Sequence, residues 1–181
     1  MSKTLEDLQE AFAGESQANR KYTYFAQKAD DEGYPQAARL FRAAARSEAV
    51  HASNHLRAMG GIRPTSENLQ AAFDGETYEV TTMYPPFIQD AQDEGNRRAA
   101  SSFEWAWKVE QEHAALYAQM LKSLDQPPVE VEYYVCPVCG HTHIGPLQKI
   151  ARYAERPGKS SRKSCSFFIR FAVHRGITEK K

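Results

Sequence analysis

The chain repeats itself at a spacing of about sixty residues, and this repeat limits its possible folds more than any other feature. LQEAFAGES at Leu8 matches LQAAFDGET at Leu69, and SEAVHA at Ser47 matches VEQEHA at Val109. The offset is 61 residues at the first match and 62 at the later one. Apolar residues recur at helical spacing in both copies, which predicts two versions of one helical hairpin.

Four helical stretches are expected within residues 1–122, and strand signals are almost absent there. Their approximate bounds are 4–30, 35–58, 67–94 and 96–122. Gly33 and Gly95 mark the ends of the first and third stretches. The segment Gly60–Asn68 joins the two hairpins, and at ~3.3 Å per residue it could cross much of a bundle's length. We therefore expect an all-α bundle of four helices with one long crossover.

The change of offset from 61 to 62 places one extra residue between Glu76 and Tyr84, inside the third stretch. A single inserted residue in a helix is commonly absorbed as a π-bulge, which favours functional sites. The adjacent pair Pro85-Pro86 would help to localise the distortion.

Charge and composition argue against several classes of function. The chain has 23 basic and 23 acidic residues, so a nucleic-acid or membrane-surface partner is not expected. No apolar run approaches the ~18 residues of a membrane span. The first residues, MSKTLEDLQEAF, lack a secretory signal, and a C-x-x-C occurs among three cysteines. We expect a cytoplasmic protein in which these cysteines serve metal or redox chemistry.

The apolar face of each of the four expected helices carries a carboxylate near its middle. The four are Glu15, Glu48, Glu76 and Glu110. Burying an ionised carboxylate among apolar residues costs several kcal/mol unless a partner compensates it. These faces offer no Lys or Arg, so a pair of metal ions is the expected partner.

Two Glu-x-x-His pairs, at Glu48/His51 and Glu110/His113, sharpen this prediction. Residues three apart project from one face of a helix. A lone pair of this kind is usually a solvated face, but here two copies occupy equivalent repeat positions beside a further glutamate each. The pattern is that of ferritin-like di-iron bundles. Oxygen-rich ligation with two imidazoles suits iron or manganese better than zinc or copper.

Several residues near these glutamates and histidines allow two interpretations. Glu79 follows Glu76 by one helical turn, and its counterpart in the first repeat is Ala18, so the pattern alone also allows an exposed position. His55 is a core residue or a neighbour of the ligands. Tyr22 and Tyr84 match in the repeat, and either pack in the core or hydrogen-bond to ligand carboxylates.

The sequence resembles the rubrerythrin family over about residues 4–145. The segments that carry the likeness are AFAGESQANRKYTYFAQKADDEG, EAVHASNHL, DGETYEVTTMYP, EQEHAALY and YYVCPVCG. The resemblance implies a ferritin-like four-helix bundle that holds two iron ions. The seven implied ligands are Glu15, Glu48, His51, Glu76, Glu79, Glu110 and His113. It also implies that Glu79 and His51 alternate as ligands of one iron when the oxidation state changes.

The implied activity is the two-electron reduction of hydrogen peroxide to water in oxidative-stress defence. Electrons would come from an external donor, a rubredoxin or a flavin reductase, through a rubredoxin-like iron site. The implied assembly is a homodimer in which one subunit's rubredoxin site faces the other's di-iron centre. Iron oxidation and storage, or metal binding without catalysis, are the alternatives.

The chain departs from the family at its rubredoxin-like site, which needs four thiolates on two C-x-x-C knuckles. Cys136 and Cys139 form one knuckle, and Cys165 stands alone. His141 and His143 could compete for a metal, but solvated loop histidines are the commoner case. We therefore expect no rubredoxin-type iron centre within one subunit.

A shifted reading frame accounts for the missing knuckle. If the codons of 150–158 are read one frame over, codon degeneracy permits C-P-x-C-G-x-P-G. We infer that residues from about 147 onward are out of frame, the alternative being a divergent native tail. Arg152–Lys181 would then have no selected structure, and the apolar run Phe167–Val173 would be an aggregation hazard.

The expected organisation has four parts. They are a bundle (1–122), a linker (123–133), a partial rubredoxin-like knuckle (134–150) and an irregular, atypical tail (151–181).

Overall fold

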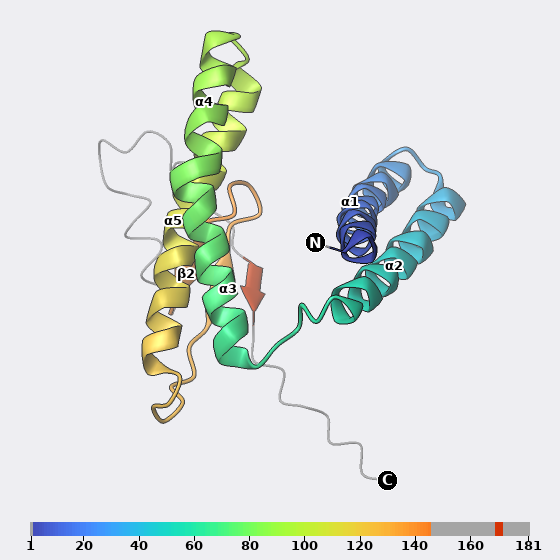
Figure 1. Ribbon diagram of the computed structural model, residues 1–181. Coiled ribbons are helices and arrows are strands. Elements are labelled where there is room, and N and C mark those ends of the chain that lie inside the picture. Colours follow the sequence, from blue (N-terminus) through green and yellow to red (C-terminus); the bar gives the residue numbers. More distant parts are fainter. Residues whose placement is uncertain (1, 146–168, 172–181) are drawn as a thin grey trace. The chain divides into compact units, whose positions relative to one another are not determined.

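A computed structural model describes residues 2–145 and 169–171 of the chain (Figure 1). The chain divides into two compact units, Met1–Pro64 and Thr65–Lys181. The boundary falls between the two sequence repeats, and each unit is described by itself. Helices dominate both units, which confirms the all-α prediction.

The first unit is a hairpin of two long helices, α1 (Lys3–Asp31) and α2 (Pro35–Ala58), which lie side by side. Ser2 caps α1 by accepting a hydrogen bond from the Leu5 N–H. Gly33 has a φ of +79°, which lets the chain turn sharply after α1. Pro35 then opens α2, where a missing N–H costs nothing.

The second unit repeats this design with an interruption in its first arm. That arm consists of α3 (Thr65–Tyr78), the π-helix η1 (Glu79–Met83) and α4 (Tyr84–Asp93). The returning helix is α5 (Arg97–Ser123), capped by Asn96, whose side chain accepts from the Ala99 N–H. The predicted bounds of all four helical stretches agree with these helices to within about three residues.

The π-helix confirms the insertion predicted from the repeat offset. It lies between Glu76 and Tyr84, where the offset changes. The Tyr84 N–H donates to the Glu79 carbonyl, five residues back. The next carbonyl in this pattern, that of Val80, would need the N–H of residue 85, which is a proline. The Trp107 indole N–H from α5 donates to the Val80 carbonyl instead, at 2.9 Å.

A trio of aromatic rings joins the two arms of each hairpin at equivalent repeat positions. In the first unit the centroids are 5.6 to 6.2 Å apart, between Tyr22, Phe25 and Phe41. In the second unit they are 5.7 to 6.4 Å apart, between Tyr84, Phe87 and Phe103. The repeat in the sequence is therefore also a repeat in packing.

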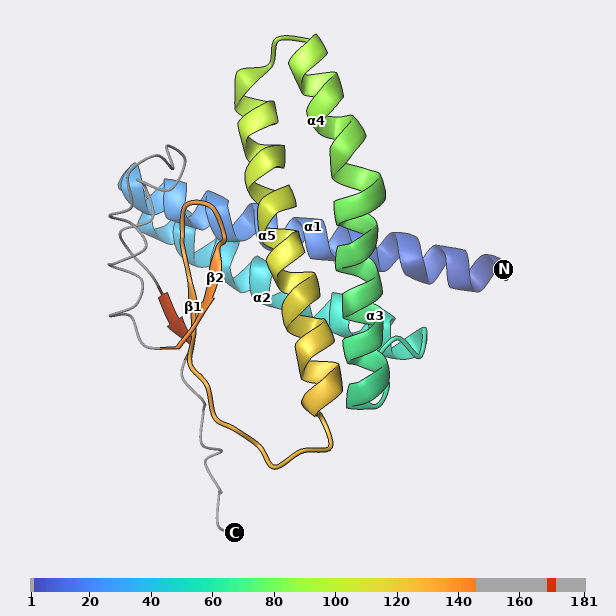
Figure 2. The ribbon, with the colours of Figure 1, turned by 90° about the vertical axis from the view of Figure 1, so that its left-hand side faces the viewer.

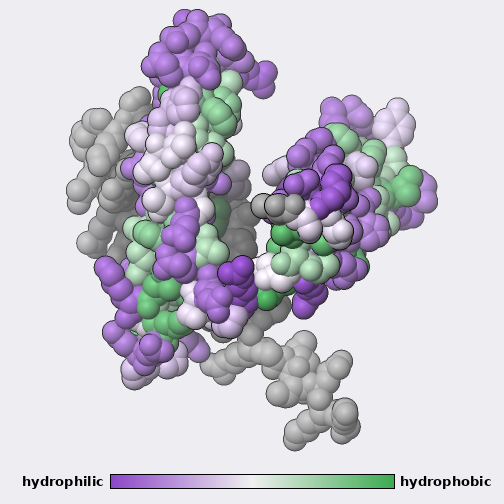
Figure 3. Space-filling view, viewed as in Figure 1, coloured by the Kyte–Doolittle hydropathy of each residue, from purple (hydrophilic) through white to green (hydrophobic). Residues whose placement is uncertain are grey.

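Small residues make up the core within each hairpin. The buried helical side chains are Ala26, Ala29, Ala38, Ala45, Ala52, Ala91 and Val109. Larger apolar side chains stay accessible, such as Leu40 at 68% and Tyr24 at 62% exposure. Figure 3 shows a hydrophilic turn between α4 and α5 and apolar residues along both hairpins. Such hairpins need a further apolar layer, as helices in a bundle do.

A small sheet follows α5. Strands β1 (Tyr133–Val135) and β2 (Thr142–Ile144) pair antiparallel, with Tyr134 opposite His143. The cysteine knuckle lies between them, and Gly140, with a φ of +79°, makes its turn possible.

Two details of the sequence prediction were wrong. Three residues of the tail expected to be irregular, Ile169–Phe171, form β3 on the free edge of β1; an apolar, β-prone run readily adds to an open sheet edge. The crossover expected over Gly60–Asn68 is shorter, because α3 already begins at Thr65. Polar residues at 65–68, with Glu67 in the first turn, favour a helix start directly after Pro64.

In the described part of the chain, no helix has both the length and the apolar character needed to cross a membrane.

Replacing Trp107 by phenylalanine should destabilise the protein by about 1–3 kcal/mol, because the Val80 carbonyl loses its donor. Trp105→Phe is the matched control, since Trp105 lies on the same helix and is 40% exposed. Urea unfolding of the two variants measures the difference. Equal stability would show that the indole bond does not support the π-helix.

Candidate metal centre

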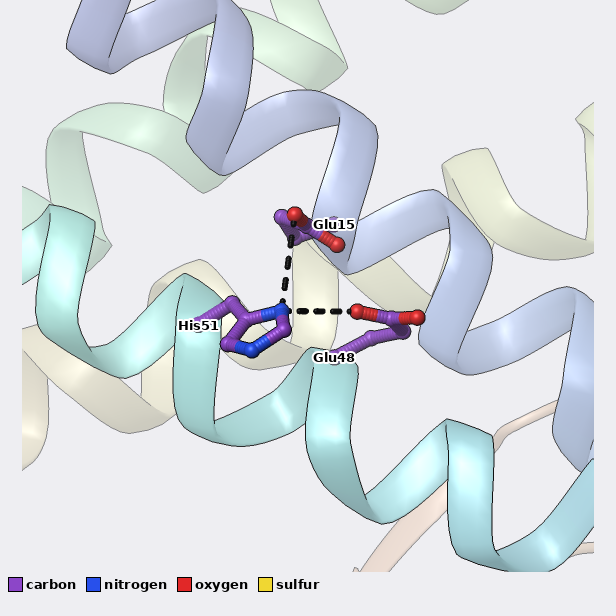
Figure 4. A group of neighbouring side chains, drawn as sticks. All are labelled: Glu15, Glu48 and His51. Carbon is purple, nitrogen blue, oxygen red and sulfur yellow. Dashed lines mark hydrogen bonds and ion pairs between the residues drawn. The ribbon is translucent and has the colours of Figure 1, made fainter.

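The first hairpin brings together one residue from α1 and two from α2. His51 Nδ1 lies 2.9 Å from Glu48 Oε2 and 3.6 Å from Glu15 Oε1 (Figure 4). The two carboxylates are half-buried, while the imidazole is 49% exposed. The i,i+3 spacing on α2 places Glu48 and His51 on one face, and the packing of α1 adds Glu15.

The second hairpin carries the same cluster at the repeat-equivalent positions. His113 Nδ1 lies 2.7 Å from Glu110 Oε2, both on α5. It lies 3.7 Å from Glu76 Oε1 on α3. All three side chains are half-buried.

In each cluster one possible ligand atom per residue lies within 4.8 Å of the others. Two carboxylates and an imidazole nitrogen turned toward them suit a hard or borderline cation such as iron. Six of the seven predicted ligands thus fall into two groups of three, one on each hairpin. Their ligand role stays a prediction.

Burial, and after it repulsion between carboxylates, shifts the pKa values of the second cluster. Burial raises the pKa of Glu76, and the Glu110 carboxylate raises it further, although His113 acts in the opposite direction. The pKa of Glu79 is raised by burial and then by Glu76. A bound cation would relieve this repulsion and favour the ionised form of the carboxyl groups.

Glu79, the seventh predicted ligand, is the first residue of η1. Its side chain is half-buried, and both Glu76 and His113 influence its pKa. Glu79 therefore does not take the exposed position that the pattern alone also allowed, and its role as a ligand stays a prediction. Regular helical periodicity in the sequence would not place the Glu79 side chain correctly, because the π-helix changes the direction in which residues project.

The two tyrosines are half-buried, and each packs in the aromatic trio of its own hairpin. Their hydrogen bonds to ligand carboxylates stay a prediction. The carboxylates of the cluster also affect the pKa of Tyr84. Its pKa is raised by burial first, and then by Glu79, Glu110 and Glu76. The phenol is thus within electrostatic range of the carboxylates and keeps its proton.

Strand β2 lies next to α5 (Figure 2). Thr142 Oγ1 lies 2.9 Å from His113 Nε2, the nitrogen that faces away from the carboxylates. His141 Nδ1 lies 2.5 Å from Glu112 Oε2, so the reading of His141 as a solvated loop residue was wrong. These contacts join residues 29 apart, and no spacing or motif in the sequence indicates them.

A cavity of about 240 Å³ lies along this contact. His113 and Thr142 line it together with five apolar or aromatic side chains from α3, α5 and β1. It gives a molecule of a few atoms access to the imidazole of His113 in this unit.

The cysteine knuckle presents two thiols. Cys136 is buried at 1% exposure, and Cys139 is half-buried. Hydrogen bonds from the Cys136 N–H to the His141 carbonyl and from the Gly140 N–H to the Cys136 carbonyl close the turn. Cys165 and most of the segment from about residue 147 onward, which we infer to be out of frame, lie outside the described residues.

The family model for rubrerythrin matches residues 6–121. Nigerythrin of Nitratidesulfovibrio vulgaris is 38% identical over 156 residues, which cover 78% of this chain and 77% of the relative. The chain belongs to the rubrerythrin family. Membership assigns its helices to the ferritin-like class and implies an iron-binding protein.

Other members of the rubrerythrin family are comparably similar. The rubrerythrin of Porphyromonas gingivalis is 38% identical over 157 residues, covering 77% of this chain and 78% of the relative. Rubrerythrin-1 of Clostridium acetobutylicum is 35% identical, with coverages of 80% and 85%. A structure of partially reduced nigerythrin aligns at a TM-score of 0.46 and 36% identity, covering 81% of this chain and 78% of that one.

Glu15→Ala and Glu110→Ala should each weaken metal binding at least tenfold, a loss of about 1.4 kcal/mol. They should also lower the melting temperature of the metal-loaded protein, because the remaining carboxylates lose part of their compensation. Glu79→Ala should have a milder effect. Glu10→Ala, at an exposed position of α1, is the control. Full iron loading with unchanged melting in both cluster variants would contradict the ligand assignment.

Thr142→Val should weaken metal binding by about 10- to 100-fold, whereas Thr142→Ser should not. The Thr142 hydroxyl can accept from His113 Nε2–H and so hold the tautomer in which Nδ1 is free to bind a metal. A chelator-competition titration measures both affinities. Equal affinities for the valine and serine variants would show that the hydroxyl has no such role.

Proposed function

We propose that this rubrerythrin-family chain is a non-haem di-iron peroxidase that reduces hydrogen peroxide to water in oxidative-stress defence. The observation that carries the proposal is the repetition of one Glu/Glu/His cluster on both hairpins. A single cluster of this composition would be unremarkable on a protein surface. Its recurrence at equivalent packing positions indicates a two-metal site.

The side chains that would hold the iron pair are Glu15, Glu48, His51, Glu76, Glu79, Glu110 and His113. Once bound, two ferrous ions supply the two electrons that one hydrogen peroxide molecule needs to form two water molecules. The chain contributes position and charge. Carboxylates can change between bridging and terminal binding, which accommodates both oxidation states.

Hydroxyl groups beside the proposed ligands help to orient them. The Thr142 hydroxyl holds His113 through Nε2, and the protonated Tyr84 hydroxyl can donate toward the glutamates of its unit. Burial and neighbouring carboxylates raise the pKa of Glu76 and that of Glu79, and a bound cation would act in the opposite direction by favouring the ionised carboxylates.

Electron supply is the step for which this chain carries the fewest residues. Cys136 and Cys139 provide two of the four thiolates of a rubredoxin-type site. We propose that an external donor, a rubredoxin or a flavin reductase, supplies electrons to the di-iron centre. Because the other two thiolates are missing, this supply is slow.

The iron-loaded, chemically reduced protein should be oxidised by about one equivalent of hydrogen peroxide per iron pair, and much more slowly by dioxygen. Stopped-flow absorption measures both rates. Steady turnover with an external reductase should be weak. A chain with the reading frame restored after residue 147 should gain both iron–thiolate absorption and turnover.

Two outcomes would contradict these expectations. Iron uptake with dioxygen far beyond two ions per chain, without faster oxidation by peroxide, would identify a storage protein. Iron–thiolate absorption at one centre per subunit in the unaltered chain would show that the tail does not impair the rubredoxin-type site.

A further inference from the structure

The segment between the two hairpins is short and begins with a tight turn. Helix α2 ends at Ala58 and α3 begins at Thr65. The Gly60 N–H donates to the Arg57 carbonyl and the Gly61 N–H to the Leu56 carbonyl, both at 2.9 Å. With Gly60 at a φ of +67°, these bonds curl the chain back onto the end of α2. Only the residues after Gly61 are left to extend.

A ferritin-like bundle sets a minimum length for this segment. In that fold α2 and α3 run parallel, so their connection crosses the bundle. Glu48 precedes Ala58 by ten residues, about 15 Å of helix, and Glu76 follows Thr65 by eleven, about 16 Å. If Glu48 and Glu76 lie level at one metal centre, the two helix ends are about 31 Å apart along the bundle.

The connection cannot span that distance. The seven steps from Ala58 to Thr65 cover at most about 25 Å at ~3.6 Å each, and the four steps from Gly61 cover about 14 Å. A crossing within one chain would have to uncoil the end of α2 and unwind the first turn of α3. Both turns are regular in the structure.

We propose that two copies of this chain exchange hairpins, so that each bundle combines α1–α2 of one copy with α3–α5 of the other. Each di-iron centre then takes Glu15, Glu48 and His51 from one chain and Glu76, Glu79, Glu110 and His113 from its partner. The inference rests on the proposed di-iron function and identifies which chains build that site.

Symmetry permits this arrangement. A twofold axis perpendicular to two adjacent bundles places the end of α2 in one bundle beside the start of α3 in the other. The short connection then passes between bundles and need not cross one. Short hinge segments are known to favour such exchange.

The packing within each hairpin fits the same scheme. Each hairpin assembles its own ligand cluster and aromatic trio, so exchange breaks neither. Its core consists mainly of alanines, while larger residues such as Leu40 and Phe87 remain 68% and 41% exposed. The complementary hairpin of the second copy is the occupant that would cover such residues.

Complementation between two inactive variants tests the exchange. One variant carries Glu48→Gln with His51→Gln, and the other carries Glu110→Gln with His113→Gln. Each is expected to form homodimers without an intact centre. After co-expression with different affinity tags, the heterodimer should contain one intact centre, half the iron-pair content of the wild-type dimer. A heterodimer without a centre, although the wild type binds iron, would overturn the proposal.

Lengthening the connection provides the converse test. About twelve Gly/Ser residues inserted after Pro64 add roughly 40 Å of reach, so each chain could close its own bundle. Complementation should then be lost, whereas the metal-free wild-type protein should sediment as a dimer in analytical ultracentrifugation. A wild-type chain that is already monomeric would overturn the exchange. Failure of the wild type to bind iron would instead refute the di-iron function, because sedimentation does not depend on the metal.

Discussion

Repulsion among carboxylates on half-buried helix faces is the constraint on which the rest of this protein depends. Burial and the neighbouring Glu110 both raise the pKa of Glu76, so the cluster without a cation is strained electrostatically. Five glutamates would carry five negative charges, which lies between the four positive charges of two ferrous ions and the six of two ferric ions. A site of this charge suits both oxidation states about equally well.

The sequence predicted those features that follow from periodicity. The repeat offset located the π-helix, and the Glu-x-x-His spacing located both clusters, because helical geometry fixes which residues share a face. Contacts set by tertiary packing were not predictable. Thr142 meets His113, and His141 meets Glu112, only because the sheet lies against α5. The length of the connection was also misjudged, because the start of α3 depends on a first turn whose polar residues could equally belong to a loop.

The contact between the sheet and α5 bears on electron delivery. Cys136 and Cys139 lie on the knuckle between β1 and β2, and Thr142 of β2 touches the imidazole of the second cluster. A covalent path therefore runs from the thiols along a few residues to a side chain that contacts a proposed ligand. Cys136, Cys139 and Thr142 all precede residue 147, so an altered tail would leave this contact unchanged and would remove only the second pair of thiolates that a rubredoxin-type iron needs.

The π-helix has a consequence for how this protein can change. Deleting any one of the five residues Glu79–Met83 would restore a regular α-helix with better local hydrogen bonding. The same deletion would rotate every following side chain on that arm by about 100° relative to those before it. The first hairpin already has the spacing that such a deletion would give, because its Glu15 and Tyr22 are one residue closer in sequence than Glu76 and Tyr84. It holds the equivalent ligand cluster and aromatic trio on the unbroken helix α1. The inserted residue is therefore not needed for the cluster or the trio. It gives the second arm a π-turn that begins at Glu79 and a Val80 carbonyl that accepts from the Trp107 indole.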